Sequence, residues 1–374
     1  MMLTKKVEHY SGANLQHICN GECPQPTELM NGAQQTSSRK EEHVRLCTEA
    51  DVRFRQKTTG LEQYDFDYVA LPELDFEQIA TTTNFLGKRL DAPLLISSMT
   101  GGYDGATAIN AALARVCQQR RLALGLGSMR QALESHTHRE SFAIVRKIAP
   151  DIPLIANIGA TQLVQGVAPR QVERLVTMIS ADAIAVHLNP LQELLQPEGT
   201  PRFHGVLAAI AELIATLPVP VIVKEVGAGI SGRVAEQLIS IGVQIVDVAG
   251  AGGTSWAGVE LLRTHTAQHP LTELWDCGIP TADCIVEVAA LRKQVPLVII
   301  GSGGIVNGFD AAKAIALGAD LVGIARPVLQ ALQRGETELN RYLDEWELQL
   351  RAAMFITGSA TIAALGSARL RRRS

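Results

Sequence analysis

Eight short apolar segments recur along the chain from residue 93 onward, and each runs into glycine, serine, asparagine or another small polar residue. Apolar runs of this length that lack polar alternation indicate strands buried on both faces, as in a parallel sheet. The segments are 93–99, 122–128, 153–158, 183–188, 219–226, 243–249, 296–301 and 321–325.

Segments with the apolar spacing of a helix separate these runs. A strand followed by a helix, repeated eight times, predicts an α/β protein of the (β/α)8 TIM barrel type. A doubly wound parallel sheet is the alternative, but it usually has fewer strands and would leave this strand count unexplained. The clearest helical segments are 110–120, 170–180, 203–216, 233–241 and 308–317.

Three regions lie outside this repeat. Residues 1–38 are polar and aperiodic, so we expect a flexible N-terminal leader, with residues 39–374 forming a single barrel domain. The gap 250–295 is the longest between two apolar runs, which predicts an inserted helix pair or a lid. Residues 335–374 have a helical pattern and end in three arginines, and we expect this basic tail to be solvated rather than to bind nucleic acid.

The overall composition narrows the classes of function. The chain has 374 residues, 47% of them apolar, and a net charge of −4, so it offers no global positive field for nucleic acid or an anionic membrane. No run approaches the roughly 18 apolar residues of a membrane span. Six scattered cysteines fit a reduced cytoplasmic protein. Cys19 and Cys23 form the one close pair, with His17 nearby, and a metal site there would need more ligands at regular spacing.

Polar and cationic residues follow nearly every predicted strand. In a TIM barrel the active site lies where strands end and βα loops begin, so these side chains are expected to meet at one rim. The segment 301–304, Gly-Ser-Gly-Gly, opens a helix after strand seven. Together with the loop after strand eight, it predicts a site for a phosphorylated ligand, because glycine loops and helix N-termini bring backbone N–H groups to phosphate oxygens.

Four other residues at this rim each allow two interpretations. Lys224 ends an apolar strand, where it is expected to face an anionic group such as a reduced flavin, or else to pair with Glu225 or another barrel carboxylate. Glu193 suits Mg²⁺ beside a diphosphate, or is an ordinary glutamate at a helix start. His187 is either a core histidine or a site residue, and Trp256 either covers a pocket or packs beneath the long loop.

Several motifs, which follow one another between about residues 39 and 365, indicate the function more specifically. The most specific are Arg-Lys-x-x-His at 39–43, Ser-Met-Thr-Gly-Gly at 98–102 and His-Leu-Asn-x-Leu-Gln-Glu at 187–193. In combination they resemble type 2 isopentenyl-diphosphate delta-isomerase, whereas the glycine loops and the barrel are shared with many flavin enzymes. The resemblance implies an isomerase of isoprenoid biosynthesis that uses FMN to interconvert isopentenyl and dimethylallyl diphosphate.

The resemblance also implies a set of site residues and partners. Glu193 would bind Mg²⁺, NADPH would reduce the flavin, and the enzyme would be a homo-oligomer, a tetramer or octamer, without nucleic acid or membrane partners. The substrate diphosphate would be bound by Arg39, Lys40, Ser128, Arg130 and Gln192. The catalytic pocket would include His187, Gln192 and Trp256. FMN would be held by Ser98, Met99, Thr100, Ser128, Asn157, Lys224, Thr254, Gly303, Gly304, Ala325 and Arg326.

The predicted reaction adds a proton to one alkene carbon. It then removes a different proton from a carbon two positions away. Glu225 and His187 are the side chains at the rim that could do this, but neither has an evident partner in the sequence to tune its pKa. The reduced flavin is therefore the better acid–base agent. One departure from the family is Val306, where an arginine is common after the two glycines, so backbone N–H groups would hold the phosphate instead.

Three other functions remain as alternatives. A flavin oxidase of 2-hydroxy acids would need a His-Gly and arginine cluster after strand six, and the sequence there is Gly-Ala-Gly-Gly-Thr-Ser-Trp. An enzyme like IMP dehydrogenase would need a nucleophilic cysteine in that loop, and Cys277 and Cys284 come over twenty residues later. A non-catalytic flavin-binding scaffold would have no need of Arg39, Lys40 and Glu193.

Overall fold

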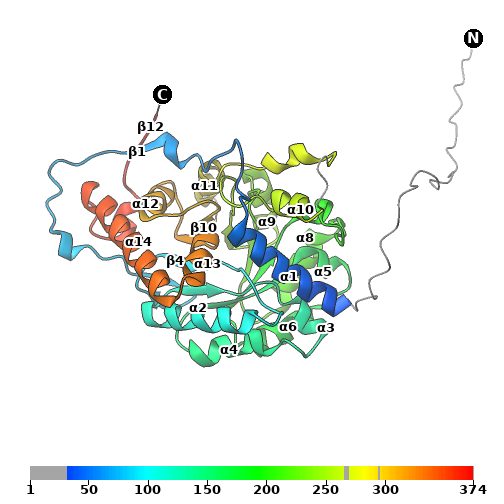
Figure 1. Cartoon of the computed structure of the whole chain (residues 1–374). Helices are drawn as coiled ribbons and strands as arrows, with labels where there is room; N and C mark the ends of the chain where they lie inside the picture. Colours follow the sequence, from blue (N-terminus) through cyan, green and yellow to red (C-terminus); the bar gives the residue numbers. More distant parts are fainter. Residues whose placement is uncertain (1–31, 265–268, 294, 374) are drawn as a thin grey trace, which may run out of the picture.

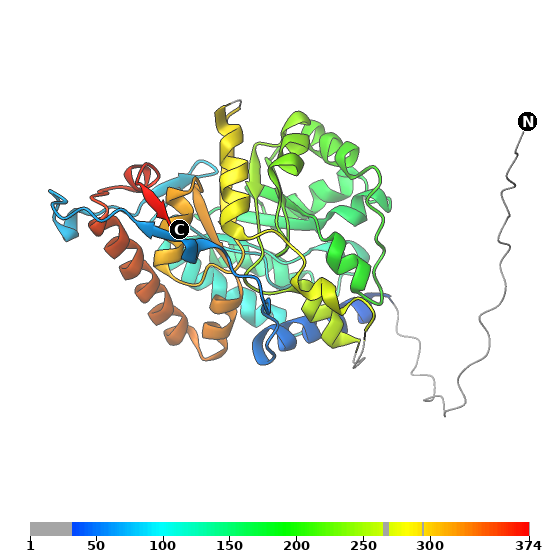
Figure 2. The same cartoon turned by 90° about the horizontal axis from the view of Figure 1, so that it is seen from above.

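The computed structural model describes residues 32–264, 269–293 and 295–373, and within these ranges eight parallel strands close into a barrel. Neighbouring strands follow chain order around the barrel, so the predicted TIM barrel is confirmed and the doubly wound sheet is excluded (Figures 1 and 2). The strands are β4 (Leu94–Ile96), β5 (Ala123–Gly125), β6 (Leu154–Gly159), β7 (Ala183–His187), β8 (Val221–Lys224), β9 (Ile245–Asp247), β10 (Val298–Ser302) and β11 (Leu321–Ile324).

Helices follow the strands and cover the outside of the barrel, as Figure 2 shows from above. All five helical segments expected from the sequence are present. The helices after the first strand are α2 (Ala106–Arg120), α3 (Arg130–Glu134), α4 (Glu140–Ile148), α5 (Ala160–Val164), α6 (Pro169–Met178), α7 (Pro190–Leu195), α8 (Val206–Thr216), α9 (Gly232–Ser240), α10 (Trp256–Arg263), α11 (Thr281–Ala289), α12 (Gly308–Ala316), α13 (Arg326–Gln333), α14 (Glu336–Ile356) and α15 (Ile362–Leu365), with short 3-10 helices η3 (Thr272–Asp276) and η4 (Ala290–Lys293).

The barrel strands are apolar on both faces because each face meets a different part of the core. Leu95 and Ile155 point into the barrel interior, whereas Leu94 and Ile96 pack outward against the helices. A hairpin of β2 (Thr83–Phe85) and β3 (Lys88–Leu90) closes the N-terminal end, where its apolar residues join the interior cluster. The opposite end, where the strands deliver their polar residues, is thereby left for a ligand.

The chain ends differ from the expectation in their secondary structure. The basic tail forms β12 (Leu370–Arg372), which pairs antiparallel with β1 (Tyr64–Phe66) instead of continuing a helix, while its arginines are exposed as expected. Arg371 and Arg373 form ion pairs with Asp67 and Asp65, so this charge is partly neutralised within the chain. Two 3-10 helices, η1 (Leu61–Gln63) and η2 (Phe76–Gln78), flank β1.

Helix α1 (Gly32–Glu49) begins six residues before the expected end of the leader. It lies against the barrel near α13 and α10 (Figure 1), and Thr36 is already buried. The boundary at residue 38 therefore falls inside a helix, because tertiary contacts stabilise a polar segment that has no apolar periodicity of its own. The remainder of the leader, including His17, Cys19 and Cys23, lies outside the described residues.

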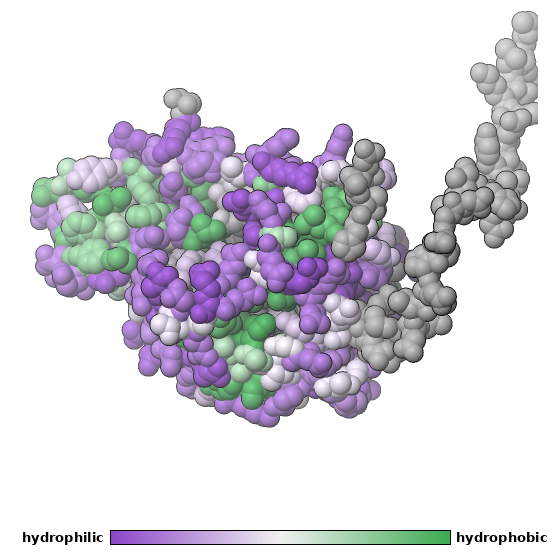
Figure 3. Space-filling view, in the orientation of Figure 1, coloured by the Kyte–Doolittle hydropathy of each residue, from purple (hydrophilic) through white to green (hydrophobic). Residues whose placement is uncertain are grey.

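The described surface is mostly hydrophilic, with scattered apolar side chains. Figure 3 shows green patches over the end of the molecule that carries α14, where Leu71 and Leu348 are exposed. Among the described residues no helix combines the length and the apolar character that crossing a membrane requires.

Candidate functional site

A cavity of about 420 Å³ opens at the C-terminal ends of the barrel strands, which is within the usual size range of ligand pockets. The structure brings every predicted site residue to its wall. These are Arg39, Lys40, Ser98, Met99, Thr100, Ser128, Arg130, Asn157, His187, Gln192, Glu193, Lys224, Thr254, Trp256, Gly303, Gly304, Ala325 and Arg326.

One end of the cavity is a glycine cradle after β10. Gly303 and Gly304 have φ angles of +100° and +72°, and a Cβ at Gly304 would lie 2.6 Å from Thr59 and 2.7 Å from backbone atoms of Gly252 and Gly253. Thr281 Oγ1 donates a hydrogen bond of 2.6 Å to the Gly303 carbonyl, which fixes the turn. Only glycine fits here, so the backbone approaches the cavity closely enough to bind phosphate oxygens.

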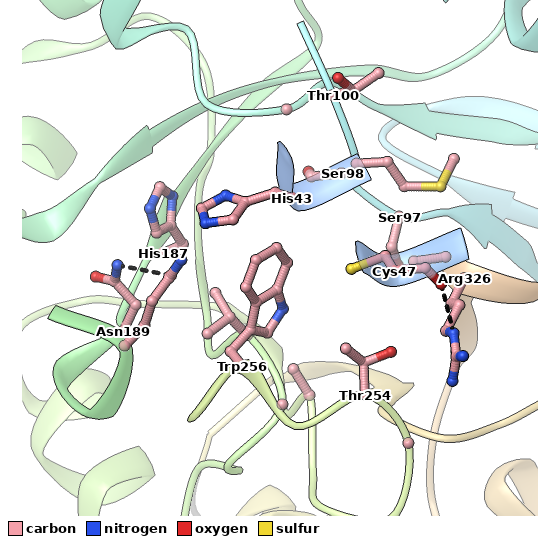
Figure 4. Close-up of a pocket in the computed structure, with 18 of the residues that line it drawn as sticks. His43, Cys47, Ser97, Ser98, Thr100, His187, Asn189, Thr254, Trp256 and Arg326 are labelled. Atoms are coloured by element: carbon pink, nitrogen blue, oxygen red, sulfur yellow. Dashed lines mark hydrogen bonds between the residues drawn. The ribbon is translucent and has the colours of Figure 1, made fainter. Parts of the chain in front are cut away.

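Arg326 also borders this end, but its side chain has a different role from that of a phosphate ligand. Its Nε donates to the Cys47 carbonyl at 2.7 Å and its Nη2 to the Ala50 carbonyl at 3.0 Å, as Figure 4 shows for Cys47. The guanidinium thus binds the carbonyl groups at the C-terminal end of α1. With the side chain engaged there, only the backbone at the start of α13 is available to a phosphate.

Val306, where the family commonly has arginine, lines the rim of the cavity and is 46% exposed. Its carbonyl accepts a hydrogen bond of 2.7 Å from the Tyr342 hydroxyl. The backbone of this turn is therefore anchored without a cationic side chain.

The strand-end residues form the wall beside the cradle. The Ser97 hydroxyl is buried and has no hydrogen-bond partner among the described residues, so it can donate to a ligand. Asn157 donates from Nδ2 to the Leu126 carbonyl at 3.1 Å, which orients its amide. Ser98 and Thr254 also line the cavity, and Figure 4 shows them at its upper and lower parts.

Lys224 reaches the cavity at the bottom of this wall. Its ammonium hydrogen-bonds the Glu225 carbonyl and lies 4.0 Å from the Asp247 carboxylate. Burial raises the pKa of Asp247, although the nearby Lys224 charge and a hydrogen bond from Ser302 act against that shift. The lysine therefore combines a buried carboxylate partner on the next strand with access to a ligand.

The alternative pairing of Lys224 with the Glu225 side chain is wrong. Glu225 turns away from the cavity, and its Oε2 accepts hydrogen bonds from four successive backbone N–H groups, those of residues 226–229. Burial raises its pKa in spite of these bonds. Glu225 is thus occupied in holding a turn and is removed from the acid–base candidates.

His187 does have a partner, contrary to the expectation from sequence. Its Nδ1 lies 2.8 Å from the Asn157 Oδ1. Burial first, and then the charges of Lys224 and Lys40, lower the pKa of His187 to about 3. The imidazole is therefore neutral at physiological pH and is a poor general acid.

A cationic cluster lies above this wall and comes mainly from α1. Lys40 Nζ donates to the carbonyls of Gly101 at 2.5 Å and Ser128 at 2.8 Å. Burial, followed by the charges of Arg39 and Arg130, lowers the pKa of Lys40 to about 7. Burial also lowers the pKa of Arg39. Burying several cations side by side costs solvation free energy. Because the structure nevertheless places them together, the cluster indicates a site for an anion.

Helix α7 places an amide and a carboxylate at the side of the cavity. Glu193 is buried and accepts hydrogen bonds from Asn189 Nδ2 at 3.2 Å and the Thr200 N–H at 2.9 Å. Asn189 Oδ1 is buried without a partner among the described residues. Gln192 Nε2 donates to Glu260 at 2.9 Å. No group of three acidic, histidine or cysteine side chains that could hold a metal occurs in the described ranges, so Glu193 would need ligand oxygens to complete a metal site.

Three aromatic rings gather at one side of the pocket in Figure 4, those of His43, His187 and Trp256. The His43 and Trp256 rings are 5.1 Å apart at an interplanar angle of 79°. Trp256 begins α10, so the interpretation that it covers the pocket is supported over packing beneath the loop. The Trp256 indole and the His187 imidazole, which is neutral at physiological pH, suit a hydrocarbon group at this wall.

Sequence reasoning missed several residues that shape the site. His43 and Cys47 line the cavity from α1, and Asp247 and Glu260 lie buried behind its wall. The Arg-Lys-x-x-His motif was a signal for His43. Asp247 and Glu260 lie in segments whose pattern gives no such signal, because they are apolar stretches with one charge whose partners come from other elements.

Comparison with known proteins gives the family. Residues 165–372 match the family described as FMN-dependent dehydrogenase. A protein named isopentenyl-diphosphate delta-isomerase from Pelodictyon phaeoclathratiforme is 48% identical to this chain, with coverage of 88% of the chain and 95% of the relative. Relatives of the same name from Nostoc sp. and Synechococcus sp. are 49% and 51% identical, over 88% and 87% of this chain and 93% and 94% of their own.

Among solved structures, the fold is similar to that of a mandelate oxidase in complex with (S)-2-phenylpropionate, with a TM-score of 0.64 over 91% of this chain and 97% of that chain. The sequence identity is 17%, so this likeness concerns the barrel fold alone. The sequence relatives share far more than the fold, with about half of all residues identical over nearly their whole length. The chain therefore belongs to the FMN-dependent, type 2 isopentenyl-diphosphate delta-isomerase family.

Proposed function

We propose that this protein interconverts isopentenyl diphosphate and dimethylallyl diphosphate at a reduced FMN, as a step of isoprenoid biosynthesis. Family membership gives the reaction and the flavin. The single structural observation that supports it most is that one cavity joins a glycine cradle, an aromatic wall and the cations Arg39, Lys40 and Arg130. The cavity can therefore hold a flavin phosphate and a substrate diphosphate at separate places.

The residues at the wall fit FMN. Gly303 and Gly304, with the start of α13, would hold its phosphate through backbone N–H groups. Ser98, Met99, Thr100, Ser128 and Asn157 would contact the ring system, and the unpartnered Ser97 hydroxyl offers one more donor. Thr254 would lie near the phosphate, and Ala325 and Arg326 would contribute their backbone.

Lys224 is proposed to act on the electronic state of the flavin. An ammonium beside the pyrimidine ring stabilises negative charge on a reduced flavin. The Asp247 carboxylate at 4.0 Å offers the buried Lys224 side chain an opposite charge and helps to hold it in place. Reduced FMN supplies the acid–base chemistry at the alkene when it is bound.

The diphosphate is proposed to bind between α1 and α7. Arg39, Lys40, Ser128 and Arg130 reach the cavity from one side, and Gln192 with Glu193 reaches it from the other. Glu193 would bind Mg²⁺ together with diphosphate oxygens, since the ion needs few protein ligands when phosphates complete its shell. Fixing the diphosphate in this way fixes the alkene at the end of the chain.

His187 and Trp256 are proposed to line the isoprenoid pocket. A neutral imidazole and an indole exclude water from a developing tertiary cation and place no positive charge beside it. Gln192 would touch the substrate, with its amide held by Glu260 at 2.9 Å. In catalysis these side chains would thus bind the substrate, orient its alkene and shield the alkene from water.

NADPH is proposed as the source of the reduced flavin. The isomerisation has no net redox change, so one reduction would prime many turnovers. We also expect a homo-oligomer, a tetramer or octamer, which light scattering would test.

The test is incubation of isopentenyl diphosphate with FMN-loaded protein, Mg²⁺ and NADPH, with each component omitted in turn. We expect dimethylallyl diphosphate to form only when all are present. Oxidation of a 2-hydroxy acid by the same protein would instead support the oxidase alternative, and bound flavin without turnover of either substrate would support the scaffold. The loop after β9, residues 250–255, contains neither histidine nor arginine, which argues against the oxidase.

A further inference from the structure

A single arginine that does not line the cavity connects three elements around its mouth. Arg263 lies in the last turn of α10, and its side chain is 7% exposed. Its Nε is 2.9 Å from Glu42 of α1, its Nη2 is 3.0 Å from Glu198 after α7, and its Nη1 is 2.6 Å from Glu260 of its own helix. One guanidinium therefore contacts a carboxylate from each of three segments.

These contacts outweigh the cost of burying the charge. Burial lowers the pKa of Arg263, but hydrogen bonds and charges of the three glutamates raise it above its usual range. A buried ion pair of this kind is costly to break, because removing one partner leaves the other charged and without solvent. The network is thus a fixed connection rather than a loose surface pair.

Each partner of Arg263 carries part of the diphosphate site. Glu42 lies two and three residues after Lys40 and Arg39 on α1, and Glu198 follows the α7 segment that holds Gln192 and Glu193. Glu260 accepts the Gln192 amide at 2.9 Å and lies 2.9 Å from His43 Nε2. The guanidinium therefore lies at the point where the two halves of the diphosphate site join.

Other contacts also hold α1 in place, and one of them, between His43 Nε2 and Glu260 at 2.9 Å, belongs to the same network. Arg326 binds the C-terminal carbonyl groups of α1. Lys40 holds its N-terminal half through the Gly101 and Ser128 carbonyls, but Lys40 is itself a proposed ligand of the diphosphate. The contact between Arg263 and Glu42 holds the middle of the helix and uses no side chain that lines the cavity.

We propose that Arg263 is a positioning residue for the diphosphate, which rests on the function proposed above. It holds α1 in a fixed place relative to α7 and α10, so that Arg39 and Lys40 approach the same phosphate oxygens as Gln192 and Glu193. Preorganised ligands bind more tightly because less ordering is left to occur on binding. Arg263 contacts no substrate itself.

The test compares Arg263→Met, Arg263→Lys and Glu42→Gln with wild-type protein loaded with FMN. Glu42→Gln leaves Arg263 two carboxylate partners and weakens its connection to α1, because a neutral amide can accept the hydrogen bond but forms no ion pair. Arg146→Met is the matched control. Arg146 is 17% exposed and pairs with Asp182 at 2.7 Å at the opposite end of the barrel, next to the Lys88 ammonium.

Binding of inorganic pyrophosphate with Mg²⁺ is measured by calorimetry, and kcat and KM are measured with isopentenyl diphosphate. We expect Arg263→Met and Glu42→Gln to weaken pyrophosphate binding and raise KM by about tenfold, with kcat changed less than about twofold, because ground-state binding is lost. Arg263→Lys restores part of the affinity. The double variant is no weaker than Arg263→Met, since both changes break one connection.

Arg146→Met is expected to lower the melting temperature and leave pyrophosphate affinity unchanged. The positioning role is overturned if Arg263→Met and Glu42→Gln weaken pyrophosphate binding no more than this control does, or if kcat falls while KM and affinity stay constant. Wild-type protein that binds pyrophosphate but does not isomerise overturns the proposed reaction instead, and the pyrophosphate comparison still decides the role of Arg263.

Discussion

The Nδ1 atom of His187 lies 2.8 Å from Oδ1 of Asn157, on the neighbouring barrel strand. Because Asn157 Nδ2 donates to the Leu126 carbonyl, its Oδ1 is the acceptor, and Nδ1 of the histidine carries the proton. The contact therefore selects one neutral tautomer and leaves Nε2 as an acceptor. A pKa of about 3 keeps the ring in that form.

The lowered pKa of His187, which burial and the charges of Lys224 and Lys40 cause, predicts an acid-sensitive fold. The pKa of His187 is lowered from 6.5 to about 3, so between these values the unfolded chain binds a proton that the folded protein does not. Stability is thus lost as the pH falls from about 6.5 towards 3, by about 2 kcal/mol at pH 5.

His187→Gln removes the pH-dependent contribution of this histidine to stability. The melting temperature of the variant should therefore fall less between pH 7.5 and pH 5 than that of the wild type. Calorimetric scans of both FMN-loaded proteins check it. Equal losses for the two proteins would show that His187 is not the group responsible.

The lowered pKa of Lys40 predicts a pH-dependent affinity for diphosphate. In the free protein Lys40 loses its proton as the pH rises through about 7, whereas an anion favours the charged lysine. Binding above pH 7 should therefore take up a proton, and affinity should fall by up to about tenfold per pH unit.

Lys40→Arg keeps its charge throughout this range and should flatten the dependence. Calorimetry with pyrophosphate from pH 6.5 to 8.5 measures both proteins, and the comparison cancels the ionisation of pyrophosphate itself. Parallel profiles for wild type and variant would contradict the assignment.

The glycine cradle predicts that flavin binding is sensitive to one methyl group. Gly304→Ala places a Cβ 2.6 Å from Thr59 at a φ of +72°, so the turn must move and the phosphate site with it. We expect at least tenfold weaker FMN binding and a cost in stability of about 1–3 kcal/mol from backbone strain.

Gly87→Ala is the matched control, because Gly87 has a φ of +74° and no atom within 4 Å of the added methyl group. It should lose stability and keep FMN. Flavin absorbance after titration and desalting separates the two effects, and equal FMN retention in both variants would argue against the cradle.

Glu193 is expected to make metal binding depend on the diphosphate. It is the acidic side chain at the α7 side of the cavity, and Asn189 and Thr200 bind it without neutralising it. Glu193→Gln should reduce Mg²⁺ activation by about 10- to 100-fold with FMN content unchanged. Electron paramagnetic resonance of Mn²⁺ with and without pyrophosphate provides the direct measurement. Tight Mn²⁺ binding by the variant would place the ion elsewhere.

Lys224 is expected to set the redox potential of bound FMN. Replacing it by Met removes the charge near the flavin and leaves Asp247 without its 4.0 Å partner, which disfavours an anionic reduced flavin. The midpoint potential should fall by tens of millivolts, as spectroelectrochemistry would show. Lys224→Arg retains the charge and should restore most of the potential, whereas an unchanged potential in Lys224→Met would remove Lys224 from this role.

Much of the architecture follows from local patterns in the sequence. A buried strand such as 154–159 is apolar whichever partner it meets, and the glycines after β10 are required by their backbone conformation alone. The parallel barrel then has one end where all strand termini meet, so the rim residues could be placed together from their order in the chain. Helix α1 could not be predicted in this way, since its polar segment is ordered by contacts with α10 and α13.

By itself, the sequence determined the barrel, its phosphate loops and the set of polar residues at the mouth, because these depend on spacing along one chain. Only the tertiary structure decided the partners: Asn157 for His187, Asp247 for Lys224, and Arg263 for the glutamates of three elements. Such pairs join residues up to 221 positions apart, and their charges and hydrogen bonds depend on distances and burial that exist only after the barrel has closed.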